Sequence, residues 1–586
     1  MGVESMSNLA AEQATAYANF HWGLIPCSFY VIGAAAVGYQ LFVRKQNVLK
    51  LNEACSSVLG KHTNSFLGKL INLSFIFGLL GASATTLGLS TPMVAAALSY
   101  VFGVEYSLKL QLISLVIVTA IFTTSVTLGM KKGIANLSNL NFIIMGLLLA
   151  ITFFCGDTLF IGICDGVATA NEGMRYALPH REVVASSIEL MAEGSRLDGL
   201  VLLGSCDKIV PGLLMAAARL NLPCVVVNGG PAISGPDFNG HQSDICTTEG
   251  TALYAEGKCT LQELDDLEDV CAPTCGSCTY LGTANTMCCL TEAMGLSLPG
   301  SALVPAIYNE RLRIAFQSGE VVVDLVRKNI CARDIITEHS ISNAITTLMG
   351  MGGSTNAVLH LVALGHEIGM ETSAVIDMID RASWDIPLVA KVYPSSCYDM
   401  VDLHKAGGVQ QILKELRSKL YLDCLCVNGK TIGENIDAFR NKLGSVNRKI
   451  IRTIDDPFER GASIGIMHGN LAPHSAVAKP NTVKEELQSF TGEAIVFESE
   501  EECSNAIIDG RVKAGRVIVV RYEGPKGGPG MREMYRALKL VESHHLENSV
   551  AFITDGRFSG MNNGCAIGHI SPEAAEGGPI AIVQDG

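Results

Sequence analysis

The chain has 586 residues, a formal net charge of −14 and only 17% charged residues, and its mean hydropathy is positive at +0.31. About two to four domains are expected, because a single hydrophobic core rarely extends over so long a chain. Residues 1–160 hold eight Lys and Arg against five Asp and Glu, a net of +3, so the remaining residues carry −17. The longer part is therefore acidic and lacks the basic surface that binds nucleic acids.

Four long apolar runs without a charged residue lie within residues 1–160. They are Trp22–Phe42, Leu70–Val104, Leu110–Met130 and Gly133–Gly156. Each run meets or exceeds the roughly 20 residues that a helix needs to cross a bilayer, which predicts an all-α transmembrane segment. The first run lacks the charged start and the small-residue cleavage site of a signal peptide, so we do not interpret it as one.

Basic residues concentrate in the loop 43–69 and directly after Met130, and such clusters favour the cytoplasmic side. If Leu70–Val104 crosses the membrane once, both clusters are cytoplasmic but the acidic part lies outside the cell. If it crosses twice, the acidic part returns to the cytoplasm but Lys131 and Lys132 lie outside. We expect a membrane location through the N-terminal spans, with the acidic part in the cytoplasm, and leave the number of crossings open.

Three stretches give residues 10–160 a family resemblance. They are Phe20-His21-Trp22-Gly23, Ala84-Thr85-Thr86-Leu87-Gly88-Leu89 and Lys132-Gly133-Ile134-Ala135-Asn136-Leu137-Ser138-Asn139-Leu140-Asn141. This segment resembles a fragment of the betaine/carnitine/choline transporter family. The glycine-rich unwound helix and the aromatic substrate cage of such transporters have no counterpart in this sequence, so a working osmolyte site is not expected.

The pattern changes after the apolar segment to short β-branched runs that alternate with amphipathic stretches. It predicts a helix, a strand, a helix and a strand at Val183–Gly194, Gly199–Leu203, Gly212–Leu220 and Pro223–Val227. This spacing is typical of a βαβ unit, so we expect a parallel sheet with helices on both faces. Ligands bind at the carboxyl ends of such strands, where Gly204-Ser205-Cys206-Asp207-Lys208 falls.

Short strands separated by turns dominate the later sequence, after about Asp402. The predicted strands are Ser463–Met467, Ala494–Phe497, Arg516–Val520 and Val550–Thr554. They indicate a second, smaller β-rich domain. The expected organisation is a transmembrane segment at 1–160, an α/β domain at 163–402 and a β-rich domain at 403–586.

Cysteines are frequent, and 16 of the 19 follow residue 160. Five of them cluster at Cys271, Cys275, Cys278, Cys288 and Cys289. Clustering favours a reducing compartment and a metal or cluster site over a disulfide framework. A single cysteine is more often a small buried hydrophobic residue, and we expect Cys275, Cys288 and Cys289 to be buried bystanders.

Several polar motifs follow one another through the acidic part. They are Asp165-Gly166, Asn171-Glu172-Gly173-Met174-Arg175-Tyr176, Ser205-Cys206-Asp207-Lys208, Pro273-Thr274-Cys275-Gly276-Ser277-Cys278, Gly282-Thr283-Ala284-Asn285-Thr286-Met287, Gly352-Gly353-Ser354-Thr355-Asn356, Tyr522-Glu523-Gly524-Pro525-Lys526-Gly527-Gly528-Pro529-Gly530-Met531, Thr554-Asp555-Gly556-Arg557-Phe558-Ser559-Gly560 and Gly568-His569-Ile570-Ser571-Pro572-Glu573. In content and order they resemble the dihydroxy-acid dehydratase and phosphogluconate dehydratase family.

The resemblance implies a hydro-lyase that converts a 2,3-dihydroxy acid to a 2-keto acid, as in valine and isoleucine biosynthesis. It also implies that the second domain is a swivelling, β-barrel-like domain and that the active site lies between the two domains. A homodimer formed through the dehydratase part is implied as well.

Loss of water from a dihydroxy acid needs a Lewis acid at the leaving hydroxyl, neutralisation of the carboxylate and a base for the C2 proton. By resemblance, Cys206 and Cys278 hold an iron–sulfur cluster, either 2Fe-2S or 4Fe-4S. The family's magnesium ligands match Asp165, Asp207, Glu533 and a carbamylated Lys208. Carbamylation matters because an unmodified lysine cannot coordinate a dication. Ser559 matches the family's base.

Glycine-rich turns at 352–353 and 527–530 are either ordinary turns or cradles for the substrate carboxylate. We favour cradles, because Ser354, Thr355 and Asn356 open an apolar helical run whose N-terminus binds anions. The sequence has no Gly-x-Gly-x-x-Gly and no phosphate-loop motif, so a nucleotide cofactor is not indicated.

The sequence departs from the family at both ends of the dehydratase part. The transporter-like segment replaces the stretch that often supplies a third cluster cysteine, for which Cys155 and Cys164 are poor candidates. We expect the last domain to be truncated at its end. Tyr280-Leu281-Gly282 leans toward the phosphogluconate branch or a less common dihydroxy-acid branch. Two alternatives therefore stay open: an aldonate or phosphogluconate dehydratase, and a membrane transport fragment with an inactive dehydratase passenger.

Overall fold

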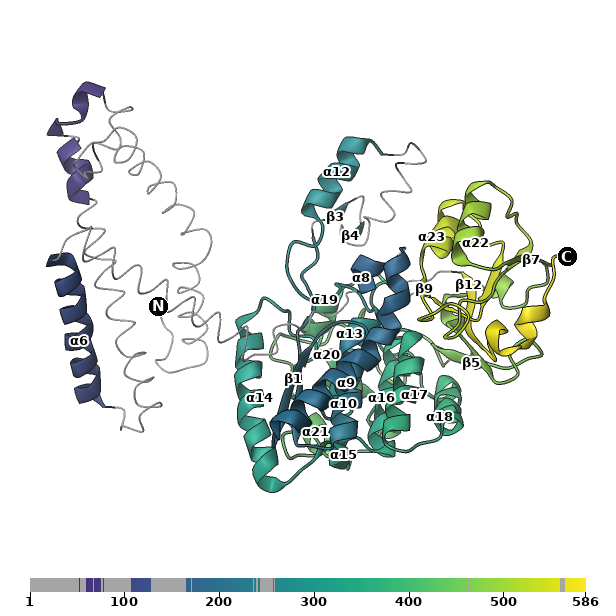
Figure 1. Cartoon of the computed structure of the whole chain (residues 1–586), viewed down its shortest axis with the longest axis horizontal. Helices are drawn as coiled ribbons and strands as arrows, with labels where there is room; N and C mark the ends of the chain where they lie inside the picture. Colours follow the sequence, from purple (N-terminus) through teal and green to yellow (C-terminus); the bar gives the residue numbers. More distant parts are fainter. Residues whose placement is uncertain are drawn as a thin grey trace. The chain divides into compact units, whose positions relative to one another are not determined.

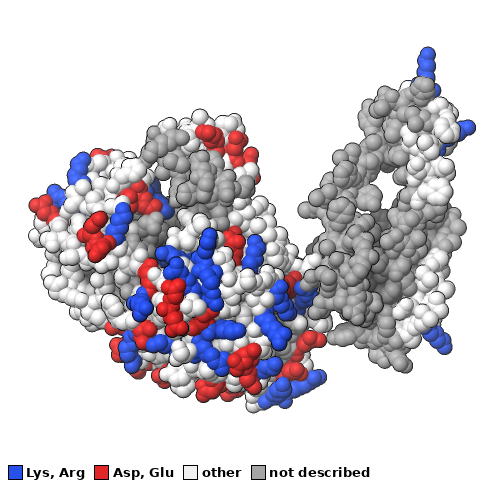
Figure 2. Space-filling view, turned by 180° about the vertical axis from the view of Figure 1, so that it is seen from behind, with Lys and Arg blue, Asp and Glu red and all other residues white. Residues whose placement is uncertain are grey.

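The computed structural model describes two parts of the chain (Figure 1). In the N-terminal part it describes residues 52, 60–66, 68–74, 77 and 107–127. From 165 to 586 it describes all residues except 170, 236, 239–240, 243–253, 255–256, 258, 462 and 559–563. The chain divides into two compact units, Met1–Ile161 and Gly162–Gly586. On the face of the second unit that Figure 2 shows, basic and acidic side chains are interspersed.

The described residues of the first unit include η2 (Gly60–His62) and α6 (Leu108–Thr127). Helix α6 covers most of the predicted span Leu110–Met130, whereas Trp22–Phe42 and Gly133–Gly156 lie outside the described residues. Among the helices that are described, none has both the length and the apolar character that crossing a bilayer demands. The transmembrane segment therefore stays a prediction.

The second unit begins with the predicted βαβ unit, which the structure confirms. The elements are α8 (Asp165–Ala168), η4 (Glu172–Tyr176), α9 (Ala177–Ser195), β1 (Leu200–Gly204), α10 (Ile209–Leu220) and β2 (Cys224–Asn228). Strands β1 and β2 are parallel, with Leu200 opposite Cys224 and Gly204 opposite Asn228. Every residue of β2 is buried, as expected for a strand covered by helices. The parallel sheet that was expected here is small: within the described residues it contains only β1 and β2.

Helices make up most of the rest of this α/β part. They are α12 (Leu261–Val270), α13 (Thr283–Ala293), α14 (Asn309–Lys328), α15 (Ala332–Ile335), α16 (Glu338–Met351), α17 (Asn356–Glu367), α18 (Thr372–Asp385), α19 (Met400–Lys405), α20 (Gly408–Glu415) and α21 (Ile432–Ala438). Two short strands, β3 (Asp237–Phe238) and β4 (His241–Gln242), pair antiparallel. Helices α10 and α14 both pack on the β1–β2 pair. Helices α19 to α21 lie at and after Asp402, where short strands were expected. The predicted domain boundary between residues 402 and 403 therefore stays a prediction.

A six-stranded mixed sheet follows, in the order β5-β6-β12-β10-β8-β7. Its strands are β5 (Gly465–Met467), β6 (Ser475–Ala478), β7 (Glu493–Phe497), β8 (Arg516–Val520), β10 (Ala551–Thr554) and β12 (Cys565–Ser571). Four of these are the predicted strands. Strands β7, β8, β10 and β12 run parallel, and β6 and β5 are antiparallel to their neighbours. The order has β5 and β7 at its edges, so a barrel-like closure stays a prediction.

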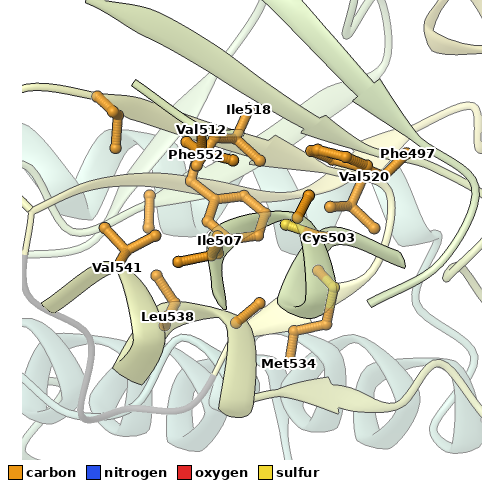
Figure 3. Close-up of a cluster of buried hydrophobic side chains, with 14 of the residues drawn as sticks. Phe497, Cys503, Ile507, Val512, Ile518, Val520, Met534, Leu538, Val541 and Phe552 are labelled. Atoms are coloured by element: carbon orange, nitrogen blue, oxygen red, sulfur yellow. The ribbon is translucent and has the colours of Figure 1, made fainter. Parts of the chain in front are cut away.

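Helices α22 (Glu500–Ile508) and α23 (Arg536–Ser543) make this domain less purely β than expected. Parallel neighbours need crossover connections, and α22 links β7 to β8 while α23 lies between β8 and β10 in the chain. Side chains of the helices and the sheet form a buried hydrophobic cluster (Figure 3). Within it, the rings of Phe552 and Phe558 meet edge to face with centroids 5.1 Å apart. Truncating such a phenylalanine to alanine costs about 3–5 kcal/mol.

A second small parallel pair, β9 (Glu533–Met534) with β11 (Arg557–Phe558), positions the polar residues of the next section. Met534 and Phe558 belong to the hydrophobic cluster. Side chains alternate between the faces of a strand, so Glu533 and Arg557 point the other way.

Candidate functional site

Three carboxylates from distant segments converge in the second unit. Asp165 is the first residue of α8, Asp207 follows β1, and Glu533 lies on β9. One oxygen from each lies within 4.8 Å of the other two, and all three side chains are largely buried. Asp207 stands at the carboxyl end of β1, the end of a parallel strand at which ligands bind. The three predicted magnesium-binding acids thus share one place in the structure.

Two buried cations accompany the three acids. The Nζ atom of Lys208 lies 2.5 Å from Asp165 Oδ2 and 3.8 Å from Asp207 Oδ2. The Nη1 atom of Arg557 lies 2.5 Å from Glu533 Oε2, and its Nη2 atom lies 4.0 Å from Asp165 Oδ2. Lys208 and Arg557 are both fully buried. A buried carboxylate needs such a partner, because an unpaired charge in the interior is strongly destabilising.

The turn between α16 and α17 also contacts this group. Helix α16 ends at Met351 and is capped by Gly352, whose φ of +63° suits glycine, and α17 begins at Asn356. Asn356 Nδ2 donates to Glu533 Oε2 at 3.0 Å and to Thr283 Oγ1 at 3.1 Å. Ser354 Oγ lies 2.8 Å from Thr283 Oγ1, and Thr355, which stands between Ser354 and Asn356 in the chain, is also buried. The predicted substrate role of Ser354, Thr355 and Asn356 stays a prediction.

Burial, more than the neighbouring charges, changes the pKa of Asp207. Burial raises the pKa of Asp207 to about 7, Lys208 opposes this, and Asp165 and Glu533 raise it further. Near neutral pH the group therefore holds a proton in part of the molecules. A divalent cation between the carboxylates would remove the repulsion and release that proton.

Family comparisons agree with this arrangement. The N-terminal domain model described as "Dihydroxy-acid/6-phosphogluconate dehydratase" matches residues 124–435, and the C-terminal model matches residues 449–586. The chain belongs to this dehydratase family. By that membership it is an enzyme of the hydro-lyase class.

Curated relatives of this dehydratase are similar over most of their length. A dihydroxy-acid dehydratase of Caldanaerobacter subterraneus subsp. tengcongensis is 48% identical over 429 residues, which is 73% of this chain and 76% of the relative. That of Methanosarcina barkeri is 47% identical over 73% of this chain and 77% of the relative. The betaine/carnitine/choline transporter family model matches residues 1–171, which is where the transporter resemblance was expected.

The three carboxylates of this dehydratase, Asp165, Asp207 and Glu533, are chemically suited to magnesium. Asp165 Oδ2 is engaged by Lys208, but Asp165 Oδ1 is buried and accepts no hydrogen bond within the described parts of the chain. Carboxylate oxygens are the ligands that Mg²⁺ prefers, and a buried oxygen without a protein donor fits a cation there. Lys208 is seen here as an ammonium group paired with Asp165, so its carbamylation stays a prediction.

Both predicted cluster cysteines lie in loops of the second unit. Cys206 follows β1 directly before Asp207, and Cys278 lies in the loop that precedes α13; both are half-buried. The nearby Tyr280 is influenced by both Cys278 and Asp207. The charge of Cys278, then burial, then the charge of Asp207 raise the pKa of Tyr280 well above its usual value. The iron–sulfur role of Cys206 and Cys278 stays a prediction.

The other cysteines of the cluster divide into two kinds. Cys288 and Cys289 are fully buried on α13, and burial raises the pKa of Cys288 to about 12. Their predicted burial is confirmed, and their role as bystanders stays a prediction. Cys275 is exposed, so the prediction that it is buried was wrong; its loop precedes the buried helix and is open to solvent.

Three predicted residues lie outside the described residues: Ser559, Cys155 and Cys164. Sequence reasoning missed Arg557 as a partner of the acids, although it stands in the same motif as Ser559. The sequence pattern that could have identified Arg557 is its place directly before the apolar Phe558 in a strand. Side chains alternate between the faces of a strand, so a buried Phe558 puts Arg557 on the opposite, polar face.

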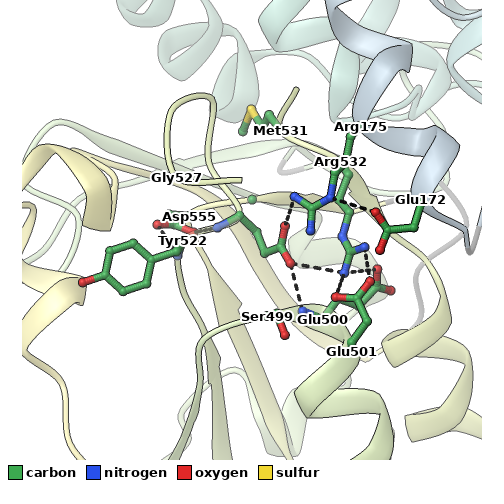
Figure 4. A network of polar contacts seen from close by, with 12 residues as sticks. Glu172, Arg175, Ser499, Glu500, Glu501, Tyr522, Gly527, Met531, Arg532 and Asp555 are labelled. Atoms are coloured by element: carbon green, nitrogen blue, oxygen red, sulfur yellow. Dashed lines mark hydrogen bonds and ion pairs between the residues drawn. The ribbon is translucent and has the colours of Figure 1, made fainter. Parts of the chain in front are cut away.

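A network of buried ion pairs joins the segment of Asp165 to the strand of Glu533 (Figure 4). Arg532 Nη2 lies 3.3 Å from Glu500 Oε2 and 3.2 Å from Glu523 Oε1, and Arg532 also pairs with Glu501. On the other side, Arg175 of η4 lies 3.8 Å from Glu523 Oε2. Because α8 and η4 are in contact, this network ties the carboxylate-bearing segments of the two domains together.

The glycine-rich loop at 524–530 binds an anion of the protein itself. The N–H groups of Lys526 and Gly527 donate to the two oxygens of Glu573, each at 2.9 Å. Asp555 accepts from the N–H groups of Tyr522 and Glu523 at 3.1 and 3.0 Å. These donors are already in use, so at Lys526 and Gly527 the expected substrate cradle holds a side chain instead.

Proposed function

We propose that this dehydratase converts a 2,3-dihydroxy carboxylic acid to a 2-keto acid, as a dihydroxy-acid dehydratase of valine and isoleucine biosynthesis. The observation that carries the proposal is the convergence of Asp165, Asp207 and Glu533 within 4.8 Å, beside the turn of Cys206. The curated relatives named dihydroxy-acid dehydratase support this substrate class. An aldonate or phosphogluconate substrate is the alternative, because the matching family model covers both branches.

The residues have distinct proposed tasks. Asp165, Asp207, Glu533 and a carbamylated Lys208 would hold Mg²⁺, and Cys206 and Cys278 would hold an iron–sulfur cluster. When bound, these groups supply Lewis acidity at the leaving hydroxyl and neutralise the substrate carboxylate. Ser559 takes the C2 proton as the C3 hydroxyl leaves with a proton as water. The enol that remains tautomerises to the 2-keto acid.

The turn at Ser354, Thr355 and Asn356 is proposed to lie against the substrate carboxylate. Support comes from its place at the start of α17, where the first N–H groups of a helix favour an anion. The side chains of this turn are buried beside Glu533, so a substrate bound there would lie next to the carboxylate group.

Formation of 2-keto acid from 2,3-dihydroxyisovalerate tests the function. Iron, sulfide and magnesium should be measured on the same protein sample, and 6-phosphogluconate and an aldonate should be assayed in parallel. The proposal expects turnover of dihydroxyisovalerate above the other two acids and its loss in Asp207→Asn. Turnover of the sugar acids alone would assign the other branch.

A transport fragment with an inactive dehydratase passenger is the second candidate, favoured by the transporter-family match at residues 1–171. We propose that this segment gives the protein a membrane location, with the dehydratase part in the cytoplasm and forming a homodimer. Membrane fractionation, protease accessibility and light scattering test these three points. Betaine uptake without any dehydration would favour the second candidate.

A further inference from the structure

The two oxygens of Glu533 are held differently. Oε2 accepts hydrogen bonds from Arg557 Nη1 at 2.5 Å and from Asn356 Nδ2 at 3.0 Å. A carboxylate oxygen has two lone pairs, so both acceptor positions of Oε2 are in use. Oε1 is therefore the oxygen of Glu533 with lone pairs to spare.

Both donors are themselves fixed by other contacts. Arg557 Nε donates to the carbonyl oxygen of Met531 at 2.7 Å, and Arg557 is the register partner of Glu533 in the β9–β11 pair. Asn356 is the first residue of α17, and its amide also donates to Thr283. The two supports come from separate elements, a strand and a helix, so together they fix the carboxylate plane.

The two oxygens of Asp165 also differ in their contacts. Its Oδ2 accepts from Lys208, while Oδ1 is buried without a hydrogen-bond donor in the described structure. Each of the two acids thus has one oxygen engaged by the protein and one left over. One oxygen of each of Asp165, Asp207 and Glu533 lies within 4.8 Å of the other two, so the three acids can share a cation, and the oxygens that the protein leaves unengaged can accept it without breaking a hydrogen bond.

We propose that Asn356 and Arg557 are positioning residues that occupy Glu533 Oε2, so that Glu533 offers only Oε1 to the divalent cation. The proposal rests on the cation site described under the proposed function. Mg²⁺ demands near-octahedral geometry, which a carboxylate bound through both oxygens disturbs, whereas Ca²⁺ accepts a carboxylate through one oxygen or both. Blocking Oε2 therefore favours Mg²⁺ over Ca²⁺, and freeing Oε2 weakens that preference.

The test compares the affinities of Mg²⁺ and Ca²⁺ for purified full-length protein by isothermal titration calorimetry, without substrate. In Asn356→Ala the affinity for Mg²⁺ should fall about 10-fold, the range found when a hydrogen bond to a metal ligand is removed. The affinity for Ca²⁺ should fall less or rise, so the ratio of the two affinities should shrink at least about 5-fold. Thr283→Val, which removes the hydroxyl that contacts Asn356 and Ser354 but leaves Asn356 in place, should give a smaller change in the same direction.

A buried asparagine elsewhere provides the matched control. Asn343 is fully buried on α16 and bonds the backbone of Tyr421, so Asn343→Ala should lower thermal stability and leave the ratio unchanged. If Asn356→Ala and Thr283→Val lower both affinities in parallel, or change neither, the positioning proposal is wrong. If the unaltered protein binds neither cation, the cation site itself is wrong, which is a separate result.

Discussion

Glu533 and Arg557 lie opposite each other in the parallel pair β9–β11, and their side chains form a buried ion pair with 2.5 Å between Oε2 and Nη1. Their chain neighbours Met534 and Phe558 point into the hydrophobic cluster. A shift of the register by one residue would exchange the two faces. The packing of Met534 and Phe558 therefore also determines where the polar pair stands.

Replacing Asp207 should stabilise the protein while removing its activity. At pH 8 the Asp207 carboxyl is mostly ionised beside two other acids, since burial raises its pKa to about 7. Asp207→Asn removes this repulsion, and the metal-free protein should gain about 1–2 kcal/mol in free energy of unfolding. Calorimetry should show no Mg²⁺ binding. Asp437→Asn, on an exposed pair with Arg417, serves as control and should change neither quantity; a destabilised Asp207→Asn would contradict the prediction.

Arg532 should be among the most important charges for stability. It is only 3% exposed and faces Glu500, Glu501 and Glu523, so Arg532→Met would leave buried acids without their cation. The expected cost is about 3–5 kcal/mol. Denaturant titration of the variant measures it.

An exposed ion pair gives the comparison for Arg532. Arg417→Met breaks the pair of Arg417 with Asp437, for which less than about 1 kcal/mol is expected. Equal costs for the two variants would show that the Arg532 network adds no stability beyond that of a surface pair.

Gly530 should not tolerate a side chain. Its φ is +88°, and a Cβ atom would lie 1.7 Å from the carbonyl oxygen of Arg175. Gly530→Ala must therefore separate the 524–530 loop from η4, and we expect a lower melting temperature together with reduced Mg²⁺ affinity. Gly577→Ala has a similar φ of +77° with open space around it, so it should show only the cost of the backbone conformation, about 1 kcal/mol. Similar melting temperatures for the two variants would exclude a tight contact at Gly530.

Lys479 should make stability depend on pH in the alkaline range. Burial lowers its pKa from 10.5 to about 8, and Glu459 opposes this. Between these values the unfolded chain binds more protons than the folded one, so the free energy of unfolding rises with pH. Relative to Lys479→Met, the unaltered protein should gain up to roughly 3 kcal/mol between pH 8 and pH 10.5. Denaturant titrations across this range, with the exposed-lysine variant Lys526→Met as control, check it; parallel curves for all three proteins would refute it.

Local patterns predicted much of the fold of the second unit. The strand and helix periods around β1, α10 and β2 were sufficient because each element is short, buried on a regular face and bounded by turns. The four strands of the larger sheet were found for the same reason. Helices α19 to α21 were missed because they are only six to eight residues long, too short for a clear helical period.

The candidate site was predicted as a set of residues but not as a network. Asp165, Asp207 and Glu533 could be named from motifs, yet the contacts of Glu533 with Asn356 and Arg557 depend on the pairing of β9 with β11 and on where α17 begins. Those are tertiary relationships that no local period encodes. The exposure of Cys275 was not foreseen either, because the prediction treated it like Cys288 and Cys289, whereas Cys275 lies in an open loop and those two lie on the buried helix α13.

The binding of Glu573 by the 524–530 loop determines how this loop responds to dissolved anions. Its carboxylate is attached to the same chain as the N–H groups of Lys526 and Gly527, so it competes there at a high effective concentration. Free sulfate or phosphate would have to displace it from both bonds at once. The loop therefore keeps its shape whether or not small anions surround the protein.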